Sequence, residues 1–255
     1  MPTLAGGDSA TPKPDRYQGH KVWGVYVAGA TYHVWTRAEV RATAQHGIQG
    51  VLPIVVPSQT TDWWLDNAGY AELELLVRQA LAWGIPKGSP LCLDIEEHQS
   101  EKMNNAVDVA RAWAIACEQR GLRPWAYGSA SFLDKDIYNN RWLAEWPNVT
   151  PVDPDPPKGY RAWQYKGNDN GIDHDVFLAN EIFLSPHLKP VKIDAGGLVT
   201  PAVEPAPLGT VAAHAVEGAG DTNTAPSGET PADPSGSDST QTPPGAAASL
   251  ESSKS

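Results

Sequence analysis

The stretch LCLDIEEHQ, residues 91–99, joins an apolar run to three acids and a histidine. Its leucines and its isoleucine alternate with Asp94 and Glu96, which is the two-residue period of a β-strand rather than the period of a helix. Such a strand places both carboxylates on one face, where they are costly unless something neutralises or uses them. The stretch therefore predicts a strand that ends in two chemically useful acids.

The pattern around this stretch recurs along the chain. Gly47, Gly84 and Gly121 are each 37 residues apart, and Gly159 follows 38 residues later. A segment with helical spacing precedes each of the first three glycines, and a strand-like run follows every one of the four. A glycine just past a helix suits the left-handed C-terminal cap, where a Cβ would be strained. The repeating unit is therefore a helix, a glycine and a strand.

Alternating helices and strands indicate parallel strands joined by helical crossovers, in the α/β class. A capping box of Thr36 and Glu39 predicts the start of one crossover helix. We expect strands near residues 22–28, 50–56, 90–96, 123–128, 141–146, 161–165 and 173–178. Seven or eight short strands favour a compact, TIM-like (β/α) barrel over an open doubly wound sheet, for which the chain shows no glycine-rich phosphate loop. Because such barrels usually need about 200 to 250 residues, some crossover helices must be reduced to loops, notably between residues 129 and 160.

Composition divides the chain into three parts. Residues 1–20 are polar and rich in proline and glycine, and we expect them to form an extended leader. All ten tryptophans lie between Trp23 and Trp163, inside a barrel domain expected over residues 21–185. Residues 186–255 are dominated by Pro, Ala, Gly, Ser and Thr. They bury too little apolar surface to offset their ordering entropy, so they predict a disordered tail.

Charge and hydropathy exclude several classes of partner. A net charge of −11 argues against a nucleic-acid partner and against adhesion to an anionic membrane. No apolar run approaches the roughly 18 to 20 residues of a membrane span, and the N-terminal residues lack the layout of a signal peptide. We expect no membrane insertion, no signal peptide and no cofactor.

The two acids of the opening stretch have the chemistry of a glycosidase. Catalytic groups in a parallel barrel lie at the carboxyl ends of the strands, where Asp94 and Glu96 are expected. Alternate residues on a strand are about 6.6 to 7 Å apart, within the roughly 5 to 9.5 Å that separates glycosidase carboxyls. One carboxylate raises the pKa of its neighbour, which keeps one acid protonated near neutral pH. The same spacing suits a metal site or a structural salt bridge, and by itself it favours none of the three.

A metal site would extend the same alternation to His98, with His174 or Asp175 as a further ligand. We favour no metal, because no second histidine lies at ligand spacing from His98. Flat aromatic side chains near strand ends suit sugar rings, although most of the tryptophans are expected in the core. Trp63, Trp146 and Trp163 are the ones expected to contact a ligand.

Four segments resemble, in order, the family 25 glycoside hydrolases, lysozymes that cut bacterial peptidoglycan. The segments are LCLDIEE (91–97), GLRPWAYGSASF (121–132), RWLAEW (141–146) and AWQYKGNDNGID (162–173). The runs GVYVAGA (24–30) and GVLPIVVPSQ (50–59) are more similar to a related group of phage and bacterial proteins of unknown function called glycoside-hydrolase-like. An origin in a phage or an actinobacterium would fit this resemblance.

The resemblance implies a (β/α) barrel that acts on a cell-wall glycan with N-acetylated sugars. Glu96 would be the general acid, and Asp94 would orient or stabilise the N-acetyl group as it attacks the anomeric carbon. Tyr127, Gln164 and Asp173 would line the cleft. The protein would then face the cell wall, outside the cell or on a phage virion, and would be cytoplasmic only before release.

One departure concerns the first strand, where the family usually has an aspartate in a G-x-D run. The matching run here is GVYV, which puts Tyr26 at that position as a substrate-binding residue. Either the first strand is missing or the site has lost an acid. The alternative function is therefore a catalytically inactive module that binds wall glycan or serves as a phage minor tail protein, with other tail proteins as partners.

Overall fold

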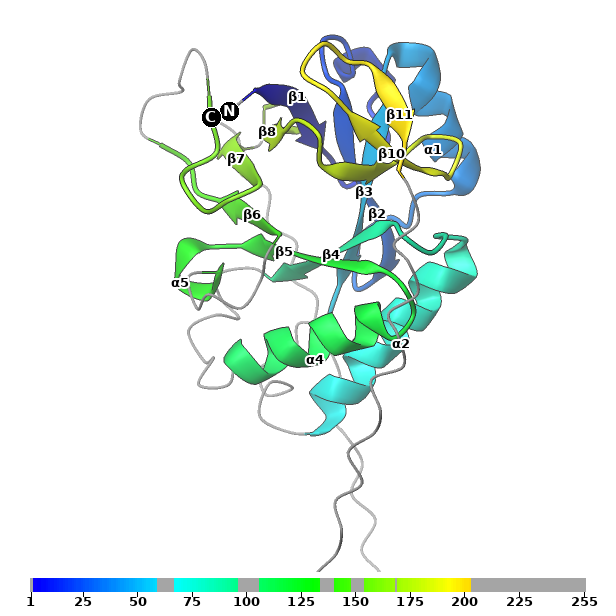
Figure 1. Cartoon of the computed structure of the whole chain (residues 1–255), viewed down its shortest axis with the longest axis vertical. Helices are drawn as coiled ribbons and strands as arrows, with labels where there is room; N and C mark the ends of the chain where they lie inside the picture. The colour runs from blue at the N-terminus through cyan, green and yellow to red at the C-terminus, as the bar shows by residue number, and fades with distance from the viewer. Residues whose placement is uncertain are drawn as a thin grey trace, which may run out of the picture. The chain divides into compact units, whose positions relative to one another are not determined.

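The computed structural model describes residues 2–58, 67–95, 106–133, 140–147, 154–167 and 169–202. Eight strands close into a barrel, because the order β3-β2-β1-β8-β7-β6-β5-β4 is completed by pairing between β3 and β4 (Figure 1). The strands are β1 (Thr3–Asp8), β2 (Val22–Gly29), β3 (Gly50–Val56), β4 (Pro90–Ile95), β5 (Arg123–Gly128), β6 (Arg141–Ala144), β7 (Ala162–Lys166) and β8 (Asp173–Leu178). Neighbours are parallel except where β8 pairs antiparallel with β1 and β7. The barrel expected from the sequence is confirmed.

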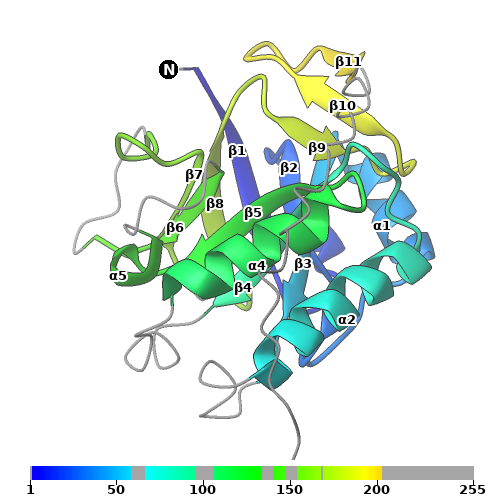
Figure 2. The same ribbon diagram turned by 60° about the horizontal axis from the view of Figure 1, so that its bottom comes forward.

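Helices cover part of the outside of the barrel. They are η1 (Pro14–Arg16), α1 (Arg37–Thr43) continued by η2 (Ala44–His46), α2 (Asn67–Trp83), α4 (Ala106–Glu118) and α5 (Ala130–Leu133). Figure 2 shows α2 and α4 side by side, and a 2.6 Å ion pair joins Glu74 Oε2 of α2 to Arg120 Nη2, just after the end of α4. The crossover from β5 to β6 carries only the four-residue α5 among its described residues. No helix in the described ranges is long and apolar enough to cross a membrane.

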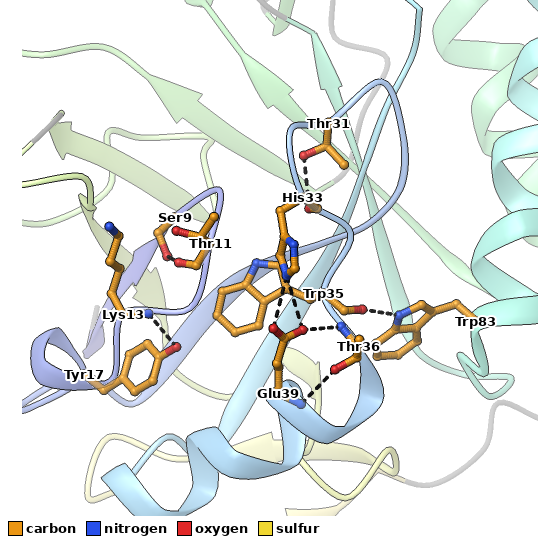
Figure 3. Close-up of polar contacts among 10 residues, drawn as sticks. All are labelled: Ser9, Thr11, Lys13, Tyr17, Thr31, His33, Trp35, Thr36, Glu39 and Trp83. Atoms are coloured by element: carbon orange, nitrogen blue, oxygen red, sulfur yellow. Dashed lines mark hydrogen bonds and ion pairs between the residues drawn. The ribbon is translucent and has the colours of Figure 1, made fainter.

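The local signals for helix ends act as the sequence predicts. Figure 3 shows the capping box at the start of α1: Glu39 N donates to Thr36 Oγ1 at 3.2 Å, and Thr36 N donates to Glu39 Oε2 at 2.6 Å. His33 Nε2 lies 3.2 Å from Glu39 Oε1 in the same group. Although burial opposes it, these hydrogen bonds lower the pKa of Glu39, so the cap is ionised at neutral pH. Gly47 ends the helical segment with a φ of 88°, as a left-handed cap requires.

The alternation along each strand creates two apolar layers. Side chains that point outward, such as Trp23, Val55 and Leu93, pack beneath the helices with Leu76 and Trp113. Side chains that point inward fill the barrel, and they include Leu4, Leu52, Ile54, Cys92, Trp125, Trp142 and Phe177. Every second residue of a strand therefore lies in the barrel interior, and the residues between them face the helices.

The expected leader over residues 1–20 is wrong. Residues Thr3–Asp8 form β1, which lies between β2 and β8 and closes the barrel. A Cβ on Gly6 would fall 2.4 Å from the Phe177 ring, and one on Gly7 would fall 2.9 Å from the Trp23 ring. The run TLAGGD is small and weakly apolar because large neighbours from other strands fill its space, so its own sequence carries little strand signal.

The expected domain end at residue 185 is also wrong. The strands β9 (Ile182–Leu184), β10 (Pro190–Ile193) and β11 (Val199–Pro201) form an antiparallel meander attached to β3 through a Val51–Leu184 pairing. Val191 and Ile193 pack with Phe183 in the interior cluster. The chain from 186 to 202 is thus part of the folded unit, while the rest of the expected tail, 203–255, lies outside the described residues.

Candidate active site

Polar side chains occupy the inward positions at the carboxyl ends of the strands. Asp8 on β1, Asp94 on β4 and Asp175 on β8 are only 3%, 4% and 1% exposed, and we call them the mouth acids. Gln164 on β7 is 1% exposed. Because β8 runs antiparallel, its first residues rather than its last reach this end of the barrel. Burial of three carboxyls in one place is costly, and such clusters are typical of functional sites.

Strand register brings these side chains together. Asp94 is the cross-strand neighbour of Tyr127 on β5, and Gln164 is the neighbour of Asp175 on β8. Asp8 is paired with Asp173, the first residue of β8. Directly opposed residues in a sheet share a face, so the two members of each pair line the same face of the barrel wall.

Asp8 and Asp175 form a coupled pair of acids. Burial, and then the neighbouring carboxylates of Asp8 and Asp173, raise the pKa of Asp175 well above its ordinary value. Trp142 Nε1 donates to Asp175 Oδ1 at 3.0 Å, which leaves the second oxygen to carry a proton. The raised pKa favours the neutral form of the Asp175 carboxyl beside Asp8.

Gln164 connects Asp8 to two aromatic side chains at the carboxyl end of the barrel, Tyr127 and Trp146. Its Oε1 accepts hydrogen bonds from Tyr127 Oη at 3.0 Å and from Trp146 Nε1 at 2.9 Å. With both donors on that oxygen, its Nε2 faces the acids and donates to Asp8 Oδ2 at 3.3 Å. The two donors fix the orientation of the amide, and that orientation requires an acceptor oxygen on Asp8.

Tyr26 stands on β2 within the field of the same acids. Burial raises the pKa of its phenol well above the ordinary value, and the charges of Asp8 and Asp94 raise it further. Tyr26 therefore stays a neutral hydroxyl, able to donate or accept a hydrogen bond at the mouth.

Trp142 forms the floor beneath the acids. A Cβ on Gly24 of β2 would fall 3.0 Å from Trp142 Cη2 and 2.7 Å from Asp8 Cβ. The indole of β6 therefore reaches across the interior to β2, and the glycine provides the space for it. Its N–H supports Asp175 from below.

Sequence reasoning missed two of the mouth acids. Tyr26 does not replace the first-strand aspartate, because the first strand is β1 and its run Gly6-Gly7-Asp8 supplies a G-x-D. The signal was present in the letters GGD but lay in the expected leader. Asp175 was considered only as a metal ligand, although the alternation in DHDVF places it on the same face as Asp173.

The other predicted site residues divide into three groups. Asp94, Tyr26, Tyr127, Gln164 and Asp173 come together at the mouth, and Trp146 lies at its rim, 63% exposed. Trp163 does not join them: it lies on the opposite face of β7 from Gln164, packs against the outer core and donates from Nε1 to Glu145 O at 2.7 Å. Glu96, Trp63 and His98 lie outside the described residues.

His174 points away from the mouth acids, because it alternates with Asp173 and Asp175 along β8. Its Nε2 lies 3.2 Å from Asp169 Oδ2, and its ring is 5.7 Å from the ring of His20. His174 is thus on the wrong face to join Asp175 in a metal site. Across the described ranges, no group of three or more His, Cys, Asp or Glu is arranged to hold a metal ion.

Functional side chains of (β/α) barrels lie at the carboxyl ends of the strands, which is where the buried acids of this barrel lie. The chain matches the family model described as the Rv2525c-like, glycoside hydrolase-like domain over residues 16–176. That match spans more than half of the chain, and the chain belongs to this family. The matched residues include Asp94, Gln164 and Asp175 and begin after Asp8.

Solved structures are similar to the chain at low sequence identity. An uncharacterized B. stearothermophilus protein is 21% identical with a TM-score of 0.51, and the match covers 68% of this chain and 94% of that one. The catalytic domain of endolysin ply40 from bacteriophage P40 of Listeria monocytogenes is 19% identical, with a TM-score of 0.48 and coverage of 68% and 92%. The Cpl-1 endolysin complexed with a peptidoglycan analogue is 12% identical, with a TM-score of 0.48 and coverage of 78% and 77%. No curated protein matches the chain.

Proposed function

We propose that the protein is a glycoside hydrolase that cleaves bacterial cell-wall peptidoglycan beside an N-acetylated sugar. The observation that carries the proposal is the convergence of three buried carboxyls, Asp8, Asp94 and Asp175, at the carboxyl ends of the barrel strands. Membership in the glycoside hydrolase-like family supports the reaction class. The choice of peptidoglycan rests on the resemblance of four sequence segments to the family 25 lysozymes.

In the proposed reaction, the glycosidic C–O bond breaks with help from the substrate's own acetamido group. The acetamido oxygen attacks the anomeric carbon while an acid gives its proton to the leaving oxygen. Water then adds to the anomeric carbon and returns a proton to that acid. Glu96, two positions after Asp94, is assigned the role of acid from the resemblance, since it lies outside the described residues.

The mouth acids have complementary parts in this scheme. Asp94 stabilises the positive charge that develops on the acetamido nitrogen as its oxygen attacks. The raised pKa of Asp175 favours its neutral form, which lowers the charge repulsion around Asp8 near the developing oxocarbenium charge. Tyr26 and Tyr127 provide neutral hydroxyls for the sugar. The protein would work where it reaches the wall, outside the cell or on a phage particle.

The experiment measures release of reducing ends from purified peptidoglycan by the full chain. We expect release by the wild type and at least about a 100-fold loss in both Glu96→Gln and Asp94→Asn, as for removal of a general acid or a stabilising charge. The matched control is Asp15→Asn, an exposed carboxylate paired with Arg16 at the surface. If the wild type binds peptidoglycan but releases nothing, the proposed hydrolysis is wrong and the protein is a binding module.

A further inference from the structure

The indole of Trp146 has no part in the proposed hydrolysis, although it is both exposed and held by a hydrogen bond. Trp146 is 63% exposed, so most of an indole lies in water, where apolar surface is unfavourable. The same side chain donates its N–H to the buried amide of Gln164 at 2.9 Å. An exposed tryptophan usually keeps several rotamers, whereas this one is tied by a hydrogen bond to an interior group.

Three further contacts hold this part of the chain in place. Glu145 N donates to Gln164 O at 3.4 Å, and Glu145 O accepts from Trp163 Nε1 at 2.7 Å. One side of the indole is set against Gly167, where a Cβ would lie 2.6 Å from Trp146 Cζ2. The residue before the indole, the indole N–H and one side of the ring are thus all anchored to β7 or to the chain just after it.

The anchored ring lies next to the acids. Gln164 bonds the indole through its oxygen and Asp8 through its nitrogen, so a single amide separates Trp146 from a mouth acid. A smaller polar side chain could donate a hydrogen bond to the Gln164 oxygen without exposing a large apolar ring to water. Pre-ordering an aromatic surface lowers the entropy lost on binding, which favours a ligand-binding role.

We propose that Trp146 is a fixed stacking platform for a sugar ring next to the one that reacts, and that Trp163, Gln164 and Gly167 are the residues that hold it. The inference rests on the proposed function for the class of ligand, an oligosaccharide of N-acetylated hexoses. The apolar C–H face of such a ring packs on the open side of the indole, while its hydroxyls remain in water. Trp163, expected from the sequence to contact ligand, supports the platform from behind instead.

The test measures binding of a soluble chitooligosaccharide and of insoluble peptidoglycan to the full chain, by calorimetry and by sedimentation. Trp146→Ala is expected to weaken chitooligosaccharide binding at least about tenfold, with a melting temperature close to that of the wild type, because the side chain is exposed. Trp146→Phe keeps a ring but loses the N–H donor, and its affinity should lie between that of the wild type and that of Trp146→Ala. Tyr70→Ala, which removes a 40% exposed aromatic from the outer helix α2, is the matched control and should bind as the wild type does.

A second variant tests the orientation of the ring and not only its presence. Gly167 does not have a left-handed backbone, so alanine fits its conformation, but the added Cβ would displace the indole. Gly167→Ala is therefore expected to weaken binding severalfold with Trp146 intact, and it decides the matter if Trp146→Ala fails to fold. Wild-type affinity in both variants would overturn the platform, as would no binding of either glycan by the wild type.

The same samples separate this inference from the proposed function. Binding that depends on Trp146, without any release of reducing ends, would leave the platform standing and refute the hydrolysis. Release of reducing ends by Trp146→Ala with an unchanged KM would refute the platform and leave the hydrolysis standing.

Discussion

At both ends of the barrel interior, alternate strand residues point inward, but these residues are polar at one end and apolar at the other. At the carboxyl ends of the strands the inward positions hold Asp8, Asp94 and Asp175. At the other end they hold apolar side chains such as Phe177, and the β9–β11 meander adds Phe183, whose ring lies 5.8 Å from the ring of Phe177. The difference shows that the apolar end stabilises the fold, whereas the polar end carries groups whose burial opposes stability and which only a function explains.

The largest expected effect comes from removing charge at the polar end. Asp8→Asn keeps an oxygen that can accept from Gln164 but removes a carboxylate that the proposed reaction requires near the sugar. If peptidoglycan hydrolysis is confirmed for the wild type, we expect kcat/KM for this variant to fall about 100-fold or more, with a melting temperature unchanged or higher. Steady-state kinetics and thermal unfolding check both parts. Full activity in Asp8→Asn would mean that β1 supplies structure and no chemistry.

A change at the apolar end should have the opposite outcome. Ile193 on β10 is fully buried in the interior cluster, so Ile193→Ala is expected to lower the free energy of unfolding by about 2 to 5 kcal/mol. Activity per folded molecule should be retained. The matched control is Leu198→Ala, since Leu198 precedes β11 and is 64% exposed; its effect should stay within about 0.5 kcal/mol. Denaturant unfolding that failed to distinguish the two variants would show that β10 is not part of the core.

A third change tests whether burial of acids lowers stability at the polar end. The folded-state pKa of Asp175 is raised above its unfolded value of about 3.9, so its contribution to stability is complete below that pH and declines as the pH rises toward the folded pKa. Asp175→Asn removes this titration, and asparagine still offers an oxygen to Trp142 and an N–H to Asp8. The variant should therefore gain stability relative to the wild type as the pH rises from about 4 to 7.

Melting temperatures of Asp175→Asn and of the wild type, compared across that range, provide the measurement. Asp15→Asn is again the surface control and should show a flat difference. A difference that shrank with rising pH would mean that Asp175 is ionised in the folded protein.

The smallest effect on stability and activity is expected from a substitution outside the barrel, at the start of α1. Thr36→Ala removes the hydroxyl that accepts from Glu39 N at the start of α1, which costs about 1 kcal/mol of stability. Neither hydrolysis nor glycan binding should change, because α1 lies on the outside of the barrel (Figure 1). Thr36→Ser restores the acceptor and should restore the stability in chemical unfolding. A loss of activity in the alanine variant would show that the β2–α1 loop contributes to the mouth.

The predicted and observed site residues, compared one by one, show which parts of the site the sequence predicts and why. The two-residue period placed Asp94, and the family resemblance placed Tyr127 and Gln164, on strands whose bounds agree with the expected ones to within one residue. The same period, applied strictly, would have separated Trp163 from Gln164, because adjacent residues on a strand face opposite sides. Asp8 was missed because glycines precede it, and its strand is specified by the Phe177 and Trp23 rings that pack on those glycines.

The sequence by itself determined the order of the strands from β2 to β8, the left-handed glycine caps, the capping box at Thr36 and the strand that carries Asp94. These features depend on residues a few positions apart, so local rules are enough to find them. Only the tertiary structure decided that Asp8, Asp94 and Asp175 meet, that residues up to 202 belong to the folded unit, and that Trp146 is held at the rim. Those outcomes depend on which distant strands become neighbours, and that choice is made by packing across the whole barrel.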